Sequence, residues 1–444
     1  MEEALVSALN SEISMGNRPS VLVIGGGIAG LSSAIAHNEA GFRVSIAEKR
    51  QKLGGRVWSD EDGIDNGPHV ILGCYKNFRR LLRAFGTEHL FKKQDTLNLT
   101  WMFPGGKLLR LEPPRLPAPI HLLVGLLKLD LPIKKRLGLL KGSVALRRQL
   151  PPTGTTLQRW FEIQKVNRDT QSLFFEPLCR AVMNVEAGKA DARLFLGTLR
   201  VAFGSSRREG AIWCPTVPWS EIIHQGAETY IHKNHIEWIH SGVTEIIPAG
   251  DGGLEAVSFR HGKKKTGFDR IVLAVPWLEA ARLSPFASFA KKAIKIEASP
   301  IVSVSFPPPR LPLPFHDLLI ALQGGEPFHF ICRQPGPKSW LTLLAGAATN
   351  PHLRTKNDWV LAGSKCLQSF LGKALPLPDN HKDLAEIRRE SKATIAATPE
   401  TADFRPPPGP TNIKGLWIAG DWTATGFPST LEGAAKSGFL CPNL

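Results

Sequence analysis

Three glycines near the start of the chain, Gly25, Gly27 and Gly30, have the spacing of a turn that binds a pyrophosphate. In such a turn the first glycine allows a tight bend, the second lets the backbone approach the phosphates, and the third lets a helix pack close to a strand. The N–H groups at the start of that helix, together with its dipole, favour the phosphate charge. The spacing therefore predicts a dinucleotide-binding turn, to which Ala29 at the start of the helix also belongs.

The segments around these glycines have the periodicity that such a turn requires. Residues 20–24 are apolar and predict a strand, residues 28–40 are rich in alanine and predict a helix, and residues 44–47 predict a second strand. Glu48 ends this second strand, where a carboxylate can accept hydrogen bonds from ribose hydroxyls, and Lys49 follows it. We therefore expect a βαβ unit that carries Glu48 and Lys49 into the nucleotide site.

Further motifs resemble a known superfamily. "LGGR" at 53–56 follows the second strand, "GIDNGPH" at 63–69 comes next, and "IAGDWT" with "STLEGA" stands near the end of the chain. Together with the glycine turn, these motifs resemble the superfamily of FAD-containing amine oxidases and phytoene desaturases. The resemblance implies an α/β fold in which a Rossmann-like FAD-binding domain is interleaved with a mixed α+β substrate domain.

The resemblance also implies roles for residues of both chain ends. It places the LGGR motif against the flavin diphosphate and ring, the final Gly-Asp pair at the ribityl-phosphate region, and the N-terminus of the last helix at the flavin pyrimidine edge. A helix N-terminus stabilises negative charge, which reduced flavin carries there. A valine in "SGVTEI" is expected to contact the adenine through its backbone. The residues carried over are Gly54, Gly55, Arg56, Gly67, Val243, Gly420, Asp421 and Leu431.

A closer resemblance, over residues 20–438, is to the hydroxysqualene dehydroxylases, the squalene-associated FAD-dependent desaturases of hopanoid biosynthesis. "RLPAPIHLL" at 115–123 and "EPLC" at 176–179 carry it, because they lie outside the motifs shared by the whole superfamily. Pro68 departs from this family's pattern, which usually has glutamine in "DNGQH". The resemblance implies that reduced FAD and hydroxysqualene, a thirty-carbon isoprenoid lipid, give squalene, water and oxidised FAD.

That reaction needs an acid that helps the hydroxyl leave as water. His69 is the first candidate, because a protonated imidazole could supply the proton, and Glu432 is the second, as a carboxyl group with a raised pKa. Each has a plainer interpretation: His69 as a structural histidine bonded to the backbone, and Glu432 as a first-turn carboxylate that stabilises a helix. Apolar residues of the predicted helical segment 155–204 could line a tunnel for the lipid, namely Phe174, Phe175, Leu178, Phe195, Leu196 and Leu199.

Other functions remain open at this point. They are a phytoene-type carotenoid desaturase, a flavin amine oxidase, and an FAD-binding protein that escorts a lipid without turnover. The chain has only two tyrosines, which weakens the aromatic cage usual around an amine. Its six cysteines are scattered without CxxC spacing, so no metal site is expected and the thiols fit a reducing cytoplasm.

Basic residues are concentrated in one segment of this 444-residue chain, whose formal net charge is +16. Residues 107–148 hold ten Lys or Arg against Glu112 and Asp130, together with many leucines. Lysines beside an apolar surface are typical of a segment lying on an anionic membrane. The alternative is a solvated basic face over ordinary core, and nucleic acid binding is disfavoured because no recognition motif is present. We expect a cytoplasmic protein bound peripherally to the inner face of the membrane, with squalene-synthase-like enzymes of the preceding steps as candidate partners.

The order of the motifs predicts how the chain is divided. We expect a disordered leader over residues 1–19 and no transmembrane helix. The FAD-binding domain is predicted to comprise residues 20–75, 235–285 and 411–440. The substrate and membrane-facing domain is predicted to comprise residues 76–234 and 286–410.

Overall fold

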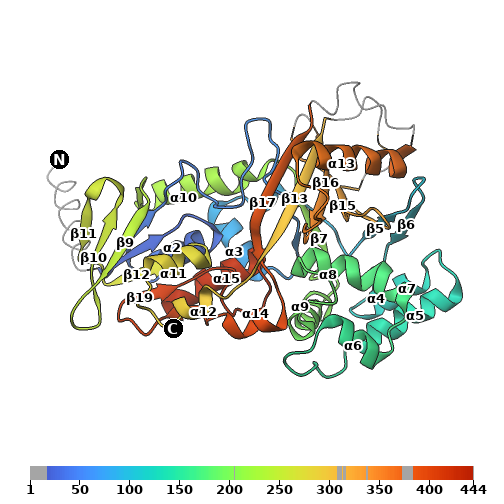
Figure 1. Ribbon diagram of the computed structural model, residues 1–444, viewed down its shortest axis with the longest axis horizontal. Helices are drawn as coiled ribbons and strands as arrows, with labels where there is room; N and C mark the ends of the chain where they lie inside the picture. The colour runs from blue at the N-terminus through green and yellow to red at the C-terminus, as the bar shows by residue number, and fades with distance from the viewer. Residues whose placement is uncertain are drawn as a thin grey trace.

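A computed structural model describes residues 18–204, 206–307, 313, 317–336, 339–372 and 384–443. Most of the expected leader therefore lies outside the described residues. The described chain contains two large sheets, two small sheets and helices that pack on and between them (Figure 1). This mixed arrangement confirms the predicted α/β fold class.

A six-stranded sheet holds the N-terminal glycine turn. Its central strand β1 pairs in parallel with strands on both sides, and all five of its residues are buried. Burial on both faces is expected for a parallel strand that is covered by helices on each side. The strand order is β18 (Gly409–Pro410), β19 (Leu416–Ile418), β12 (Arg270–Leu273), β1 (Ser20–Ile24), β2 (Arg43–Ala47) and β8 (Glu237–Ile239).

The helix after the glycine turn packs against the last helix of the chain. α2 (Ile28–Glu39) contacts α15 (Leu431–Leu440), and α15 in turn contacts α3 (Lys76–Phe85). The approach of α2 and α15 is close, because a Cβ added at Gly438 would lie 2.2 Å from the carbonyl oxygen of Ala29. The two ends of the chain therefore form one layer beside the sheet. Nearby lie α10 (Gly226–Lys233), α11 (Trp277–Leu283), α12 (Ala290–Ala293) and α14 (Pro399–Phe404).

A seven-stranded sheet forms the second large layer. Its long strands β13 and β17 stand between the nucleotide-type sheet and a helical region in Figure 1. The strand order is β17 (Glu386–Ile395), β13 (Ala298–Phe306), β16 (Leu341–Gly346), β15 (Phe330–Arg333), β14 (Leu319–Leu322), β5 (Leu99–Met102) and β6 (Leu108–Leu111). One face is buried under α13 (Lys356–Leu371), where Phe306, Leu343 and Trp359 belong to one apolar core.

The other face of this sheet lies toward a region of short helices. As expected, residues 155–204 are mainly helical, and they pack with α4 and α5 in a second apolar core. The elements are α4 (Ile120–Leu127), α5 (Ile133–Ala145), α6 (Leu157–Gln164), α7 (Arg168–Thr170), the π-helical turn η2 (Gln171–Phe175), α8 (Glu176–Met183) and α9 (Ala192–Gly204). None of the helices among the described residues is long and apolar enough to cross a membrane.

Two small three-stranded sheets complete the fold. One has the order β11 (Lys264–Thr266), β10 (Leu254–Phe259) and β9 (Val243–Pro248), and β9 brings Val243 toward the nucleotide-type sheet. The other has the order β3 (Ile71–Leu72), β7 (Ile212–Pro215) and β4 (Phe91–Lys93). A second π-helical turn, η3 (Ser220–Gln225), leads from β7 into α10.

Candidate functional site

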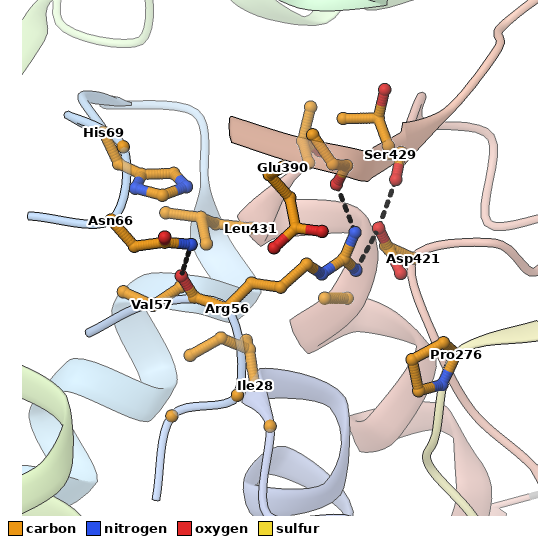
Figure 2. Close-up of a pocket in the computed structure, with 18 of the residues that line it drawn as sticks. Ile28, Arg56, Val57, Asn66, His69, Pro276, Glu390, Asp421, Ser429 and Leu431 are labelled. Carbon is orange, nitrogen blue, oxygen red and sulfur yellow. Dashed lines mark hydrogen bonds and ion pairs between the residues drawn. The ribbon is translucent and has the colours of Figure 1, made fainter. Parts of the chain in front are cut away.

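A cavity of about 490 Å³ lies where the two large sheets meet α8 and the start of α15. Figure 2 shows its centre, with Arg56, Asp421 and Ser429 on one side and His69 and Asn66 on the other. All but one of the predicted cofactor residues line it: Gly25, Gly27, Ala29, Glu48, Lys49, Gly54, Gly55, Arg56, Gly67, Val243, Gly420, Asp421 and Leu431. Gly30 is the exception, because it packs beneath the turn and does not line the cavity.

The glycine turn is crowded at its first and third glycines. Gly25 has a φ of +108°, and a Cβ there would lie 2.5 Å from the carbonyl oxygen of Ala274. A Cβ at Gly30 would lie only 1.9 Å from the carbonyl oxygen of Gly25. Side chains are therefore excluded where the turn bends and where α2 packs against it. Gly27, the residue before α2, gives no side-chain cap, so the first N–H groups of the helix are available to a ligand.

The LGGR loop lies directly on this turn. The Gly54 N–H donates to the carbonyl oxygen of Gly26 over 2.8 Å, and a Cβ at Gly55 would lie 3.0 Å from Gly27 Cα. Gly54 itself has a φ of +112°. The two glycine loops therefore meet backbone to backbone, which leaves main-chain groups rather than side chains to face a ligand.

The carboxylate of Glu48 accepts hydrogen bonds from backbone N–H groups of the glycine turn and of the residue that follows Lys49. Its Oε2 accepts from the Gly26 N–H over 2.8 Å, and its Oε1 accepts from the Arg50 N–H over 2.9 Å. The side chain also lines the cavity. Because each carboxylate oxygen has two lone pairs, these bonds leave Glu48 able to accept from ligand hydroxyls as well.

An ion pair joins the two ends of the chain inside the cavity. Arg56 Nη2 donates to Asp421 Oδ2 over 2.7 Å, and the same carboxylate accepts from the Ser429 hydroxyl (Figure 2). Arg56 also donates to the carbonyl oxygen of Ala393 in β17. This pair therefore fixes the LGGR loop, the terminal segment and β17 relative to one another.

Arg405 forms hydrogen bonds with the terminal segment that contains Asp421, a role that was not predicted from the sequence. Its buried guanidinium donates to the carbonyl oxygens of Asp421, Trp422, Thr423 and Phe427. Burial lowers the pKa of Arg405 to about 10, so the side chain stays charged at neutral pH. Nothing in the proline-rich segment around it indicates this role, because all four acceptors are main-chain atoms.

The structure corrects the proposed role of Glu432. Its carboxylate accepts from the N–H groups of Asn77 and Phe78 and from Asn77 Nδ2 at 2.7 Å. Only 2% of Glu432 is exposed, and it is not among the described residues that line the cavity. Burial raises its pKa, while these hydrogen bonds oppose the rise. Glu432 therefore caps the first turn of α3, which lacks a cap from its own segment.

The structure places His69 in the cavity but in surroundings that disfavour its protonated form. His69 lines the cavity, and its ring lies edge-on to Trp219 with 5.8 Å between the ring centroids (Figure 2). Burial lowers the pKa of His69 to about 4, and the Arg56 charge acts in the same direction. This lowered pKa disfavours the imidazolium form that an acid role needs, and the acid role of His69 stays a prediction.

Sequence reasoning missed the acidic and apolar lining that the seven-stranded sheet supplies. Glu390 of β17 faces the cavity beside Leu431 and Arg56 in Figure 2. Ile301, Leu319 and Phe330 add apolar surface from β13, β14 and β15. Of the predicted tunnel residues none lines this cavity; Phe174 and Leu178 line a smaller pocket, while Phe175, Phe195, Leu196 and Leu199 are buried core.

These features fit a flavin dinucleotide. The uncapped start of α2 and the two glycine loops suit a diphosphate, and Glu48 suits a ribose. The start of α15 is capped by its own Thr430, whose Oγ1 accepts from the Gly433 N–H over 3.1 Å, and Leu431 faces the cavity. The N-terminal end of that helix dipole can therefore stabilise the negative charge of a reduced ring.

Comparison with known proteins agrees with this assignment. The family model for flavin containing amine oxidoreductases matches residues 28–441. Hydroxysqualene dehydroxylase of Rhodopseudomonas palustris is 27% identical, with 94% of this chain and 96% of the relative covered. A 15-cis-phytoene desaturase of Arabidopsis thaliana is 23% identical, with 95% and 79% covered. The crystal structure of a putative protoporphyrinogen oxidase from Exiguobacterium sp. 255-15 shares the fold, with a TM-score of 0.67, 17% identity, and 95% of this chain and 97% of that chain covered. The protein is therefore an FAD-dependent oxidoreductase that belongs to the flavin-containing amine oxidoreductase family.

Proposed function

We propose that the protein reductively dehydroxylates hydroxysqualene to squalene. The observation that carries this proposal is the cavity itself, which joins a dinucleotide cradle to an apolar wall of Ile301, Leu319 and Phe330. Support also comes from hydroxysqualene dehydroxylases of three bacteria, which are 24–27% identical over nearly the whole chain. Water and oxidised FAD are the other products, so atoms and electrons balance.

Bound FAD in its reduced form supplies the hydride that replaces the hydroxyl group. The chain must bind the hydrocarbon, exclude water and protonate the departing oxygen. Glu390 is the group we assign to this proton transfer, because its carboxyl faces the centre of the cavity and the other cavity carboxylate drawn there, Asp421, is paired with Arg56 (Figure 2).

A pair of single-turnover reactions tests the proposed reaction. Dithionite-reduced enzyme is mixed with hydroxysqualene and, separately, oxidised enzyme is mixed with phytoene. Squalene with matched flavin oxidation in the first reaction supports the proposal. Desaturated phytoene without squalene would instead establish the second candidate, a carotenoid desaturase, which the similarity to plant phytoene desaturases favours.

The Glu390 assignment has its own test. Glu390→Gln keeps the size of the side chain but cannot donate a carboxyl proton, so squalene formation should slow by about 100-fold or more. The control is Glu400→Gln, a change at an exposed carboxylate on α14. An unchanged rate in Glu390→Gln at full flavin content would exclude this role.

We also propose that α4 and α5 dock on the anionic inner face of the cytoplasmic membrane. Ile120, Ile133 and Leu137 are 51%, 56% and 55% exposed. Lys128 and Lys134 are also exposed, so this two-helix segment presents both apolar and cationic groups to solvent. Such a surface suits the boundary between lipid headgroups and acyl chains.

Vesicle flotation tests the membrane surface. Ile133→Asp with Leu137→Asp should abolish flotation with anionic vesicles, because two charges would enter the apolar layer. The matched control is Ile294→Asp, at a residue that is 62% exposed outside this segment. Equal flotation of all three proteins would refute the docking surface.

A further inference from the structure

A second pocket adjoins the flavin cavity. Its volume is about 40 Å³, and it shares Leu319 and Phe330 with the larger cavity. The two spaces are therefore neighbours separated by two apolar side chains. Both side chains are only half-buried, which leaves them room to change rotamer.

One face of the seven-stranded sheet forms a wall that the flavin cavity and the second pocket share. In the register of β14 and β15, Leu319 lies opposite Cys332 and Ala321 lies opposite Phe330, so these four side chains point to the same face. Ala321 in turn pairs with Trp101 of β5. The same face of the sheet therefore lines both pockets, from Cys332 in the flavin cavity to Trp101 in the second pocket.

Helix α8 lines both the flavin cavity and the second pocket. Ala181 and Val182 line the flavin cavity, whereas Pro177 and Leu178, one turn earlier, line the second pocket. The π-helical turn η2 directly before α8 adds Phe174 to the same pocket. Such turns occur often at functional sites.

The volume of the flavin cavity shows why one end of a long substrate must lie outside it. A pocket for one drug-sized ligand has about 300–1,000 Å³. The flavin cavity of about 490 Å³ is therefore too small for both a flavin and an entire thirty-carbon chain. The second pocket lies in the direction of the membrane-facing helices, since Trp101 and Phe174 pack in one core with Leu126 of α4.

We infer that the second pocket is the subsite for the distal hydrocarbon end of the substrate, and that Leu319 and Phe330 form the gate between it and the flavin cavity. This inference rests on the proposed function, because only a long apolar substrate would need the extension. The gate opens by rotation of the two side chains, and the hydrocarbon then fills the space between the sheet face and α8. Chain length is thus selected at this pocket, away from the reacting carbon.

Ala321→Phe tests the subsite because Ala321 lines the second pocket and not the flavin cavity. A benzyl side chain would fill the pocket, whose volume of about 40 Å³ suits about three carbon atoms of the substrate. Each buried methylene contributes a factor of about four to affinity, so binding of labelled squalene by the FAD-loaded protein should weaken by about 50-fold. Binding of a ten-carbon isoprenoid hydrocarbon should change by less than about twofold. The control is Ala402→Phe, at an exposed position on α14.

The readouts separate this inference from the proposed reaction. Selective loss of squalene binding in Ala321→Phe supports the subsite, even if the wild type forms no squalene from hydroxysqualene. Selective loss of turnover for the thirty-carbon alcohol, with turnover of a ten-carbon allylic alcohol retained, would support both. Equal squalene binding by Ala321→Phe, Ala402→Phe and the wild type would overturn the subsite whatever the activity.

Discussion

Asp65 offers a quantitative test of the packing behind the flavin cavity. It lies in the GIDNGPH segment with only 1% of its surface exposed. Its Oδ1 accepts from the Ser59 hydroxyl over 2.5 Å and from the Trp219 N–H over 3.2 Å, whereas its buried Oδ2 has no hydrogen-bond partner. Trp219 in turn packs edge-on against His69 in the cavity wall. Asp65 is therefore a buried acid that helps to hold one wall of the site.

Burial raises the pKa of Asp65 from 3.8 to about 7, while its hydrogen bonds oppose the rise. Because the folded state binds the proton more tightly than the unfolded state, Asp65 favours folding fully below pH 3.8. This contribution declines as the pH rises and is lost by about pH 7. A shift of about three units corresponds to about 4 kcal/mol at 1.36 kcal/mol per unit. About 60% of that change falls between pH 5 and pH 8.

Asp65→Asn removes this titration and keeps an oxygen that can accept from Ser59 and Trp219. The free energy of unfolding of the variant, relative to wild type, should therefore increase by about 2–3 kcal/mol between pH 5 and pH 8. Urea denaturation of the FAD-loaded proteins at both pH values measures it, with exposed Asp403→Asn as control. The buried amide N–H₂ could cost about 1–3 kcal/mol, but this cost is the same at both pH values. A difference that does not change with pH would refute the reasoning.

Other buried groups give further predictions. Gly30→Ala should weaken FAD retention by about 1–3 kcal/mol through a backbone clash, measured as flavin per polypeptide after dialysis. Arg405→Met should lower global stability by about 3 kcal/mol or more because it leaves four carbonyl oxygens without their donor, measured by urea denaturation. His69→Gln should retain flavin and leave the pH–rate profile between pH 5 and 8 unchanged in shape, because burial holds the pKa of His69 at about 4. Glu432→Gln should cost about 1 kcal/mol of stability through the weakened cap on α3 and leave the single-turnover rate unchanged at full flavin content.

The cofactor cradle could be predicted because its chemistry is local. Gly25, Gly30 and Gly54 are required by clashes with backbone atoms, and such requirements leave glycine at fixed spacings in the sequence. The motif around Asp421 was found through its resemblance to the superfamily, since an isolated Gly-Asp pair indicates little. Its partner Arg56 lies 365 residues away in sequence, so the ion pair itself appears only in the folded chain.

The substrate half of the site could not be predicted in the same way. Leu319, Phe330 and Glu390 come from three strands of one sheet, and each strand shows only ordinary apolar or mixed patterning. Which of their side chains face the cavity depends on strand register, and a shift of one residue would turn each to the opposite face. Phe195 and Leu199 are apolar, as tunnel-lining residues would be, but they are buried in the core. The residue types alone therefore did not distinguish residues that line the site from residues of the core.

Burial changes the acid–base chemistry of both candidate acids, His69 and Glu432. His69 was judged by the chemistry of imidazole in water, which titrates near neutral pH, whereas Glu432 was expected to have a raised pKa. Burial acts on them in opposite directions, since it lowers the pKa of His69 and raises that of Glu432, and both shifts favour the neutral form. A neutral histidine cannot supply an imidazolium proton, and the carboxyl of Glu432 is turned to the α3 backbone. A proton donor for this cavity must instead face the substrate, and Glu390, which lines the cavity, is the residue that we propose for this role.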